Sequence, residues 1–324
     1  MKMLAEQTGL AGSVKKIPPV FWVTLVIMLV FSLFNRRFIS LHNIINILQQ
    51  GSILLIIAAA ATLVILTEGM DLSLGSVLTL SGIITVLALG AGVPVVFAVL
   101  LGTVTGIACG ALTGLLIAIW NMPPFIATLG IQGLYFGLAL VLTNSVAILT
   151  THRGFILLGT RIAGYIPMAA IIGGFVFIMI CFVFRNTRFG RYVIAIGGNE
   201  TGTRLSGVNT VFWKWLVYTV AGGIAGFGGV LLTARIEAAD PIVGIGWEFD
   251  AIAATILGGT SFQKGKGSVA GTALGVFLIT ILRNGLNVIR TPAILQPALI
   301  GTILILAIVI QVGFSMRKSG MKVR

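Results

Sequence analysis

The sequence predicts an all-α, polytopic membrane protein with about ten transmembrane helices. Of its 324 residues, 57% are hydrophobic and only 9% are charged, whereas an average soluble domain is about a quarter charged. The mean hydropathy is +1.11. The apolar residues form long unbroken runs, which indicate helices and not the alternating strands of a membrane β-barrel. The same composition excludes a disordered chain, because disorder needs low hydrophobicity and high charge.

Ten apolar segments approach the length of about 20 residues that a membrane-spanning helix needs. The first follows a polar tail without a small-residue cleavage site, so we interpret it as an uncleaved helix and not as a signal peptide. The segments around 66–75 and 250–262 are the least regular, and each is either a continuous span or a broken or re-entrant one. We predict the ten spans at residues 17–34, 44–66, 72–90, 93–120, 124–143, 166–184, 212–232, 250–262, 268–289 and 294–313.

The charges predict the orientation of these spans. The chain has 21 Lys and Arg residues against 8 Asp and Glu residues, a net charge of +13. With both termini in the cytoplasm, about two thirds of the basic residues lie on the cytoplasmic side, as the positive-inside rule requires. The excess then faces anionic lipid, and nucleic acid is not an expected partner. We therefore expect a cytoplasmic tail (1–19), one transmembrane domain (20–313) with a cytoplasmic loop (185–211), and a basic cytoplasmic tail (314–324).

No catalytic or metal-binding constellation stands out, so an enzyme is not expected. The segment 259–267 superficially resembles a phosphate-binding loop, but five residues separate its glycines and Gly267 follows Lys266, where the motif needs Ser or Thr. His42 and His152 are isolated, which argues against a metal site. Cys109 and Cys181 both lie in apolar runs and predict no disulfide framework. This chain is expected to carry no cofactor of its own.

Carboxylates are rare here, and each one inside a membrane segment costs about 2.5–3.5 kcal/mol unless it meets a cavity or a partner. Glu68 and Asp71 lie with Ser73 between two apolar runs. They either line or gate a permeation path, or Asp71 or Ser73 simply caps the third helix. Four further acids fall within 14 residues of a predicted external loop. This loop is either merely solvated or a docking surface for a soluble extracytoplasmic partner, and its acids are Glu237, Asp240, Glu248 and Asp250.

Glycines recur at positions that predict close helix packing. Four of them, Gly102, Gly106, Gly110 and Gly114, follow one another at intervals of four residues in the fourth predicted span. Small residues at this spacing share one helix face and let two backbones approach. The seventh predicted span, 212–232, is similarly rich in glycine.

The loop 185–211 is the longest polar segment and contains a predicted short helix. Glu200 would begin this helix, with Asn199 or Thr201 as its N-cap. Leu205 gives the helix an apolar edge. Such a helix either presses into a groove of a peripheral protein or lies on the membrane surface.

This loop also carries a family resemblance. GRYVIAIGGNETGTRLSGVN (190–209) resembles the cytoplasmic loop of ABC sugar permeases of the ribose/xylose type. DAIAATILGGTSFQKGKGSVAGTALG (250–275) is similar to that family's second signature, and LVILTEGMDLSLGS (63–76) to its third. Matching stretches run from about 44 to 313 in the family's order. The departures are Glu68, where the family more often has a small neutral residue, and the segment 144–164, which does not align.

The resemblance implies a permease subunit of a bacterial inner membrane that works as a pair. It further implies a cytoplasmic ATPase subunit that binds ATP and Mg, and a periplasmic sugar-binding protein. The residues expected to sit in the ATPase groove are Asn199, Glu200, Thr203, Arg204, Leu205, Ser206 and Gly207. Sugars need hydrogen-bond donors and acceptors more than charge. We therefore expect Asn121, Thr128, Gln132 and Thr255 to join Glu68, Asp71 and Ser73 along the translocation path.

Three other functions remain open from the sequence. The chain could be a proton-coupled secondary transporter that uses Glu68 or Asp71, since broken helices are common in such folds. It could be a membrane scaffold or sensor, although the coupling-like loop argues against this. It could also be an ABC permease for nucleosides or branched-chain amino acids. The sequence does not select among a pentose, a hexose and a polyol.

Overall fold

The computed structural model describes residues 19–162, 164–262, 265–296, 298–303 and 305, and within them the chain is mostly helical. Residues 1–18 of the predicted N-terminal tail (1–19), the predicted C-terminal tail (314–324) and half of the tenth predicted span (294–313) lie outside these residues. The α-helices are α1 (Pro19–Phe34), α2 (Leu41–Ile65), α3 (Leu74–Gly90), α4 (Val95–Gly114), α5 (Pro124–Thr143), α6 (Arg153–Ile156), α7 (Met168–Asn186), α8 (Arg188–Gly198), α9 (Glu200–Leu205), α10 (Thr210–Ile236), α11 (Trp247–Leu257) and α12 (Val269–Val288).

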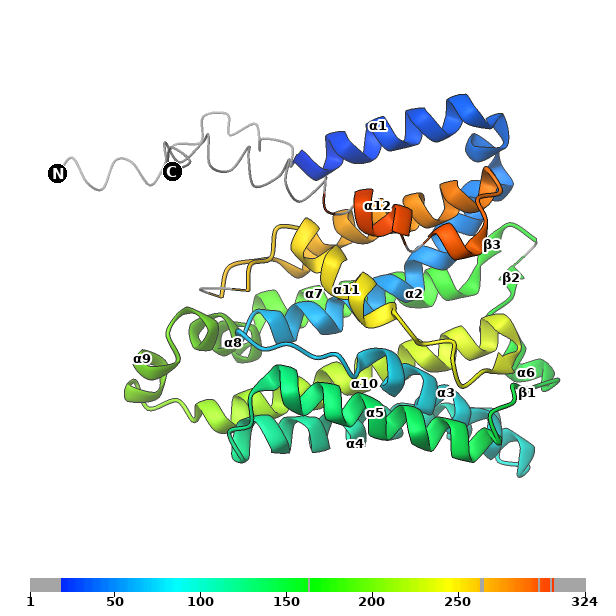
Figure 1. Cartoon of the computed structure of the whole chain (residues 1–324). Coiled ribbons are helices and arrows are strands. Elements are labelled where there is room, and N and C mark those ends of the chain that lie inside the picture. Colours follow the sequence, from blue (N-terminus) through cyan, green and yellow to red (C-terminus); the bar gives the residue numbers. More distant parts are fainter. Residues whose placement is uncertain (1–18, 163, 263–264, 297, 304, 306–324) are drawn as a thin grey trace, which may run out of the picture.

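Short elements connect these helices. They are the 3₁₀ turns η1 (Arg36–Ile39) and η3 (Ala293–Leu295), a π-helical turn η2 (Leu115–Ile119) that extends α4, and the strands β1 (Ile148–Leu149), β2 (Arg161–Ile162), β3 (Ile166–Pro167) and β4 (Ala238–Ala239). Strand β1 pairs antiparallel with β4, and β2 with β3. In Figure 1 the long helices lie side by side, with α8 and α9 at one end of the bundle, here named the α9 end. The strands and α6 lie at the opposite end, here named the strand end.

The prediction of a polytopic, mostly helical membrane protein agrees with the structure. Among the described residues, six helices are long and apolar enough to cross a membrane: α2, α4 with η2, α5, α7, α10 and α12. Two further apolar helices, α1 (from Val20) and α3, are shorter. The eighth predicted span, 250–262, is the 11-residue helix α11, which at 1.5 Å per residue reaches roughly half of the hydrocarbon thickness.

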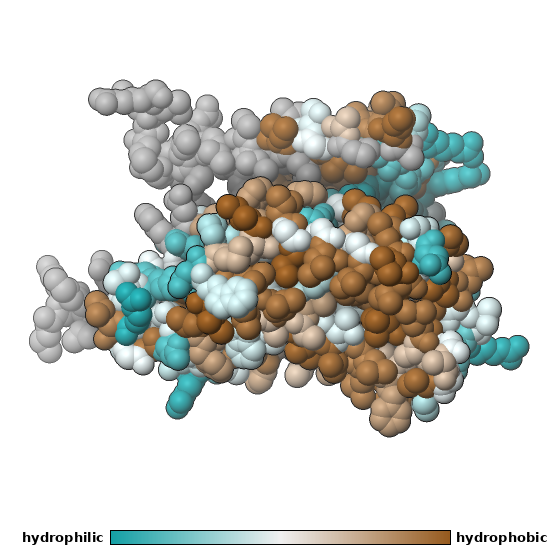
Figure 2. Space-filling model, turned by 60° about the horizontal axis from the view of Figure 1, so that its bottom comes forward, coloured by the Kyte–Doolittle hydropathy of each residue, from teal (hydrophilic) through white to brown (hydrophobic). Residues whose placement is uncertain are grey.

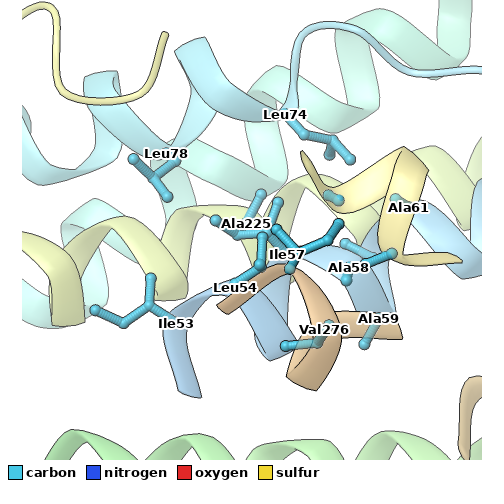
Figure 3. Packing of buried hydrophobic residues seen from close by; sticks show 14 of the residues in the cluster. Ile53, Leu54, Ile57, Ala58, Ala59, Ala61, Leu74, Leu78, Ala225 and Val276 are labelled. Carbon is cyan, nitrogen blue, oxygen red and sulfur yellow. The ribbon is translucent and has the colours of Figure 1, made fainter. Parts of the chain in front are cut away.

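Helix α2 is the centre of the hydrophobic core. Its 18-residue apolar window is 78% buried, the highest value among the six spanning helices. Figure 3 shows Ile53, Leu54 and Ile57 of α2 surrounded by side chains of three other helices. The alanines that follow in α2, including Ala58 and Ala59, are completely buried. Such small side chains let neighbouring backbones come close, which is the main packing device between helices in a bilayer.

The glycine pattern predicted from the sequence packs α4 against α10. A Cβ atom added at Gly106 would approach Gly226, and one at Gly110 would approach Gly222. A Cβ atom added at Gly222 would approach Gly106 and Gly110, and one added at Gly226 would approach Gly106. The prediction of close packing is therefore confirmed, because neither helix has room for a side chain at these positions.

The outer surface of the bundle is apolar. The apolar windows of α4 and α5 are each 28% buried, and that of α7 only 11%. Figure 2 shows a broad hydrophobic surface on one face of the molecule, with hydrophilic groups gathered toward the two ends. This distribution suits a bundle whose sides contact lipid and whose ends contact water.

Candidate functional site

Helices α3 and α11 begin inside the bundle, and their first turns meet. The chain leaves α2 at the α9 end and returns as a non-helical segment, 66–73, before α3 starts (Figure 1). Likewise 240–246 leads from β4 back into the bundle to α11. Gly75 in the first turn of α3 lies against Gly244 and against Glu248 of α11, and a Cβ atom at Gly75 would collide with both. Glycine is thus required where the two helix starts touch.

Glu248 is the carboxylate at this junction, and only 1% of its surface is exposed. Its Oε1 atom accepts a hydrogen bond of 3.0 Å from Nε2 of Gln132 and one of 3.3 Å from the backbone N–H of Gly246. Its Oε2 atom is buried and has no hydrogen-bond partner among the described residues. A buried carboxylate oxygen of this kind is costly, so it marks a site with a use beyond packing.

A cavity of about 310 Å³ adjoins this carboxylate. Its wall is largely apolar, and its polar groups come from α3, α5 and α11. The lining residues are Ser76, Thr79, Leu129, Gln132, Gly133, Phe136, Gly244, Ile245 and Glu248. An apolar pocket with a few convergent polar groups is the usual form of a small-molecule site. We name it the Glu248 cavity.

Asp71 and Ser73 shape the start of α3 instead of lining this cavity. Asp71 is 3% exposed, and one of its carboxylate oxygens accepts hydrogen bonds from the backbone N–H of Ser73 (2.8 Å) and from its hydroxyl (2.6 Å). Ser73 is the N-cap residue of α3, but its side chain makes no cap hydrogen bond. Glu68 has φ +60° and an exposed side chain, so it does not share a helix face with Asp71.

The structure separates the remaining residues predicted for the path. Thr128 is buried in α5, and its hydroxyl donates to the carbonyl of Phe125 within the same helix. Thr255 forms a hydroxyl cluster with Thr62 and Thr272 that joins α11 to α2 and α12. Asn121 is exposed between η2 and α5. Of the predicted path residues, Gln132 is the one that lines the Glu248 cavity.

The four acids predicted for one external loop do not share a surface, and that expectation is wrong for Glu248 and Asp250. Glu237 is exposed at the end of α10, and Asp240 is half-buried with its carboxylate accepting the N–H of Ile242. Glu248 and Asp250 lie in the first turn of α11, and Asp250 is only 8% exposed. The reason is that the chain turns back into the bundle after Asp240, which takes the later two acids off the surface.

The predicted short helix is present as α9, at one extreme end of the molecule (Figure 1). The Asn199 side chain accepts the N–H of Gly202 at 2.8 Å, which confirms Asn199 as the N-cap. Thr203 anchors α9 to α8, since its hydroxyl donates to the carbonyl of Ala195 at 2.9 Å. Glu200 forms an ion pair of 2.9 Å with Lys214 at the start of α10. Leu205 at the end of α9 is 82% exposed.

The turn after α9 has a fixed backbone requirement. Gly207 has φ +84°, a conformation that favours glycine. Arg204 and Ser206 are exposed beside it. The helix α9 is therefore a short, capped and water-exposed element with an apolar tip, held to α8 and α10 at its base.

A second cavity of about 310 Å³ lies among α2, α10, α11 and α12, and sequence reasoning missed it. Its polar lining includes Gln50, Arg235, Asp250, Arg283 and Asn287. One signal was available in the sequence: Arg283 interrupts the apolar run 268–289, and a cation there needs a partner. The structure supplies that partner, because Arg283 forms an ion pair with Asp250.

Comparison with known proteins identifies the class of this bundle. Residues 43–308 match the family model described as "Branched-chain amino acid transport system / permease component". The chain is 38% identical over 292 residues to the ribose import permease protein RbsC of Escherichia coli (strain K12), covering 88% of this chain and 90% of that protein. It is 37% identical over 301 residues to the ribose import permease protein RbsC of Bacillus subtilis (strain 168), with 92% and 93% covered.

A third relative is named for a different sugar. The D-allose transport system permease protein AlsC of Escherichia coli (strain K12) is 34% identical over 290 residues, with 89% of each chain covered. No solved structure matches the chain.

The chain belongs to this family of ABC-importer permease components, and the resemblance found in 63–76, 190–209 and 250–275 is confirmed. It is accordingly a multi-pass protein of the inner membrane and a translocation subunit, not an enzyme. Permeases of this class work with a separate ATPase, which hydrolyses the ATP, and with a substrate-binding protein. The comparisons do not favour the proton-coupled transporter considered above.

Proposed function

We propose that this chain translocates a monosaccharide or a related polyol across the inner membrane, receiving it from a periplasmic binding protein. The observation that carries this proposal is the high coverage of relatives named for ribose import, D-allose transport and galactose import, at 33–38% identity. The family model is described by branched-chain amino acid transport, so an amino acid is the second candidate substrate.

We infer a topology of ten crossings with both termini in the cytoplasm. Two of the crossings are made by an extended segment followed by a short helix: 66–73 with α3, and 240–246 with α11. The α9 end is the cytoplasmic end in this proposal. It is supported by the start of α1 at that end (Figure 1) and by the lysines of the polar tails, which add to the basic residues of α8.

The helix α9 is the proposed contact with the ATPase. Its exposed Leu205 would insert into a groove of that subunit, as an apolar anchor of a short helix does. Asn199, Thr203 and Gly207 would hold its shape, while Glu200, Arg204 and Ser206 would give polar contacts around the anchor. ATP and Mg are bound by the ATPase in this proposal, and this chain holds neither.

The translocation path is proposed to pass the Glu248 cavity. We infer that two permease chains pair, as a homodimer or a heterodimer, with this cavity facing the path between them. Gln132 and Glu248 would exchange hydrogen bonds with sugar hydroxyls, which are both donors and acceptors. Asp71 and Ser73 would fix the start of α3, with Thr128 and Thr255 buried behind the path. Glu68 and Asn121 would line its cytoplasmic exit.

The strand end is the proposed docking face for the binding protein. Glu237 and Asp240 lie there and would meet basic residues of that partner. Glu248 and Asp250 are not part of this docking face, because both are buried.

Reconstitution tests the proposal. The permease, its ATPase and its binding protein are placed in proteoliposomes, and uptake of labelled ribose, allose, galactose and leucine is measured with ATP inside. We expect ATP-dependent uptake of one of the sugars and none of leucine. Leucine uptake would move the substrate to amino acids. Sugar uptake driven by a proton gradient without ATP would overturn the proposal.

A further inference from the structure

The second cavity, here named the Arg235 cavity, lies toward the strand end of the bundle. It is bounded by Gln50 of α2, Arg235 near the end of α10, Trp247 and Asp250 of α11, and Arg283 and Asn287 of α12. Its lining is about evenly polar and apolar, which distinguishes it from the largely apolar Glu248 cavity. Such a polar cavity is unusual among membrane helices, because lipid offers no hydrogen-bond partners to polar groups.

Arg235 is the residue that most needs a ligand. Among the described residues its guanidinium has no hydrogen-bond or ion-pair partner. Arg161, by contrast, is held by the side chains of Asn46 and Gln49, at 2.6 and 3.2 Å. A guanidinium has five N–H donors and no acceptor. The N–H groups of Arg235 therefore have no hydrogen-bond acceptor among the described residues.

The other polar groups of the cavity offer complementary chemistry. The carboxylate of Asp250 is bound on one side by Arg283 and can accept further hydrogen bonds. The amides of Gln50 and Asn287 both donate and accept. The indole of Trp247 adds an apolar surface with one polar edge. Thr280 also lines the cavity, and its hydroxyl is buried without a hydrogen-bond partner among the described residues.

This set of groups discriminates among ligands by the balance of hydrogen-bond donors and acceptors. A carboxylate or an unprotonated phosphate would meet the donors of Arg235 but offers no donor to the carboxylate of Asp250, which is already paired with Arg283. A neutral molecule with several hydroxyl groups satisfies both, because each hydroxyl donates one hydrogen bond and accepts others. A volume of about 310 Å³ is at the lower end of ligand pockets, which suits a single small ring.

The wall of the cavity connects it with the proposed path. The segment 243–250 contributes Val243, Trp247 and Asp250 to the Arg235 cavity, and Gly244, Ile245 and Glu248 to the Glu248 cavity. One short stretch of chain therefore separates the two hollows.

We propose that the Arg235 cavity is an outer binding subsite for the monosaccharide, where Arg235, Asp250 and Trp247 hold it before it passes the 243–250 wall. This inference rests on the proposed function and adds a specificity-determining site within the permease itself. Arg235 and Asp250 are its polar determinants, and Trp247 covers one face of the sugar ring.

Protection of a cysteine from labelling tests the subsite directly. Cys109 and Cys181 are replaced by Ala, and Asn287→Cys places one thiol at the cavity wall, where the native side chain is exposed. The complex with its ATPase and binding protein is kept in vesicles, and the labelling rate with a membrane-impermeant maleimide is measured with and without ribose. The same vesicles are assayed for ribose uptake.

We expect saturating ribose to slow labelling severalfold and leucine to have no effect. Arg235→Gln should raise the ribose concentration for half-maximal protection about tenfold or more, the loss expected for one charge-assisted hydrogen bond. Arg290→Gln is the control, because Arg290 is exposed after the end of α12 and does not line the cavity. It should leave the ribose concentration for half-maximal protection unchanged.

Three outcomes would overturn the subsite. Normal ribose uptake without protection would reject it and leave the proposed function intact, and so would protection unaffected by Arg235→Gln. Labelling slowed by anionic lipid instead of ribose would identify a lipid headgroup as the occupant. No sugar uptake by vesicles that hold the unaltered permease would instead reject the proposed function, and the subsite with it.

Discussion

The amide nitrogen of Gln132 donates a hydrogen bond of 3.0 Å to the carboxylate of Glu248, across 116 residues of sequence. This bond ties the middle of α5 to the first turn of α11. The backbone N–H of Gly246 also donates to this carboxylate, at 3.3 Å. The Gln132 bond acts together with the hydrogen bond of 2.8 Å from the Tyr135 hydroxyl to the carbonyl of Cys109, which ties α5 to α4.

Removing this donor should weaken the fold. Gln132→Leu leaves Glu248 with one hydrogen bond in a buried position, at a cost of about 1–3 kcal/mol of unfolding free energy. We expect a lower Tm of the purified permease and reduced uptake. The exchange Gln132→Glu with Glu248→Gln keeps one donor facing one acceptor and should recover much of the Tm. An unchanged Tm in Gln132→Leu would show that the bond has no energetic role.

Leu205 at the tip of α9 should be essential for coupling but not for folding. Its side chain is 82% exposed, so Leu205→Asp removes no core contact. We expect loss of ATP-dependent uptake and of ATPase co-purification, with an unchanged Tm. Val146→Asp is the matched control for ATPase co-purification and Tm, because this 66% exposed apolar residue lies at the strand end and not at the α9 end. Normal uptake by Leu205→Asp would remove α9 from the ATPase contact.

Glu200 should matter through its charge. Glu200→Arg breaks the ion pair with Lys214 and places two like charges at the base of α9. Because the pair is partly exposed, its own contribution to stability is at most about 1 kcal/mol. We therefore expect uptake to be lost while membrane insertion and Tm change little. Lys214→Glu in the same chain restores opposite charges, and failure of this double variant to recover any uptake would argue against a role for the pair.

The glycine contact between α4 and α10 should tolerate no side chain. Gly222→Ala would force its Cβ against Gly106 and Gly110, so we expect a Tm loss worth about 1–3 kcal/mol or a failure to accumulate in the membrane. Gly174→Ala in α7 is the control, since a Cβ there meets nothing within 4 Å. Equal Tm values for the two variants would contradict the packing described here.

The two acids at the strand end should govern stimulation by the binding protein. Glu237→Lys with Asp240→Lys reverses the local charge without touching the buried acids of α11. We expect weaker stimulation of ATPase activity by the binding protein, most clearly at low salt because screening reduces such attraction. Stimulation equal to that of the unaltered chain at every salt concentration would exclude these acids from docking.

The sequence was informative where a local rule decides the structure. Asn199 as the cap of α9 follows from the preference of Asn for helix starts, and the four-residue glycine spacing in α4 follows from helix geometry. Neither prediction needed knowledge of distant contacts.

The misses concern contacts between distant residues. Nothing near Glu248 in the sequence indicates that Gln132 will bind it, and proximity to Glu237 suggested an exposed loop instead. The re-entry of the chain after Asp240 buries Glu248, and it brings Gly244 so close to Gly75 that neither position has room for a side chain. The Arg235 cavity was missed for the same reason, since its walls come from four helices.

The two crossings that we propose to combine an extended stretch with a short helix also affect how topology is measured. A hydropathy count that omits both α3 and α11 assigns every loop from 91–94 to 237–246 to the side of the membrane opposite to the proposed one. The second omission then cancels the first, so that a reporter fused at the C-terminus gives the expected signal for either topology. A reporter inserted within 144–167 distinguishes them, because the two topologies place this loop on opposite sides of the membrane.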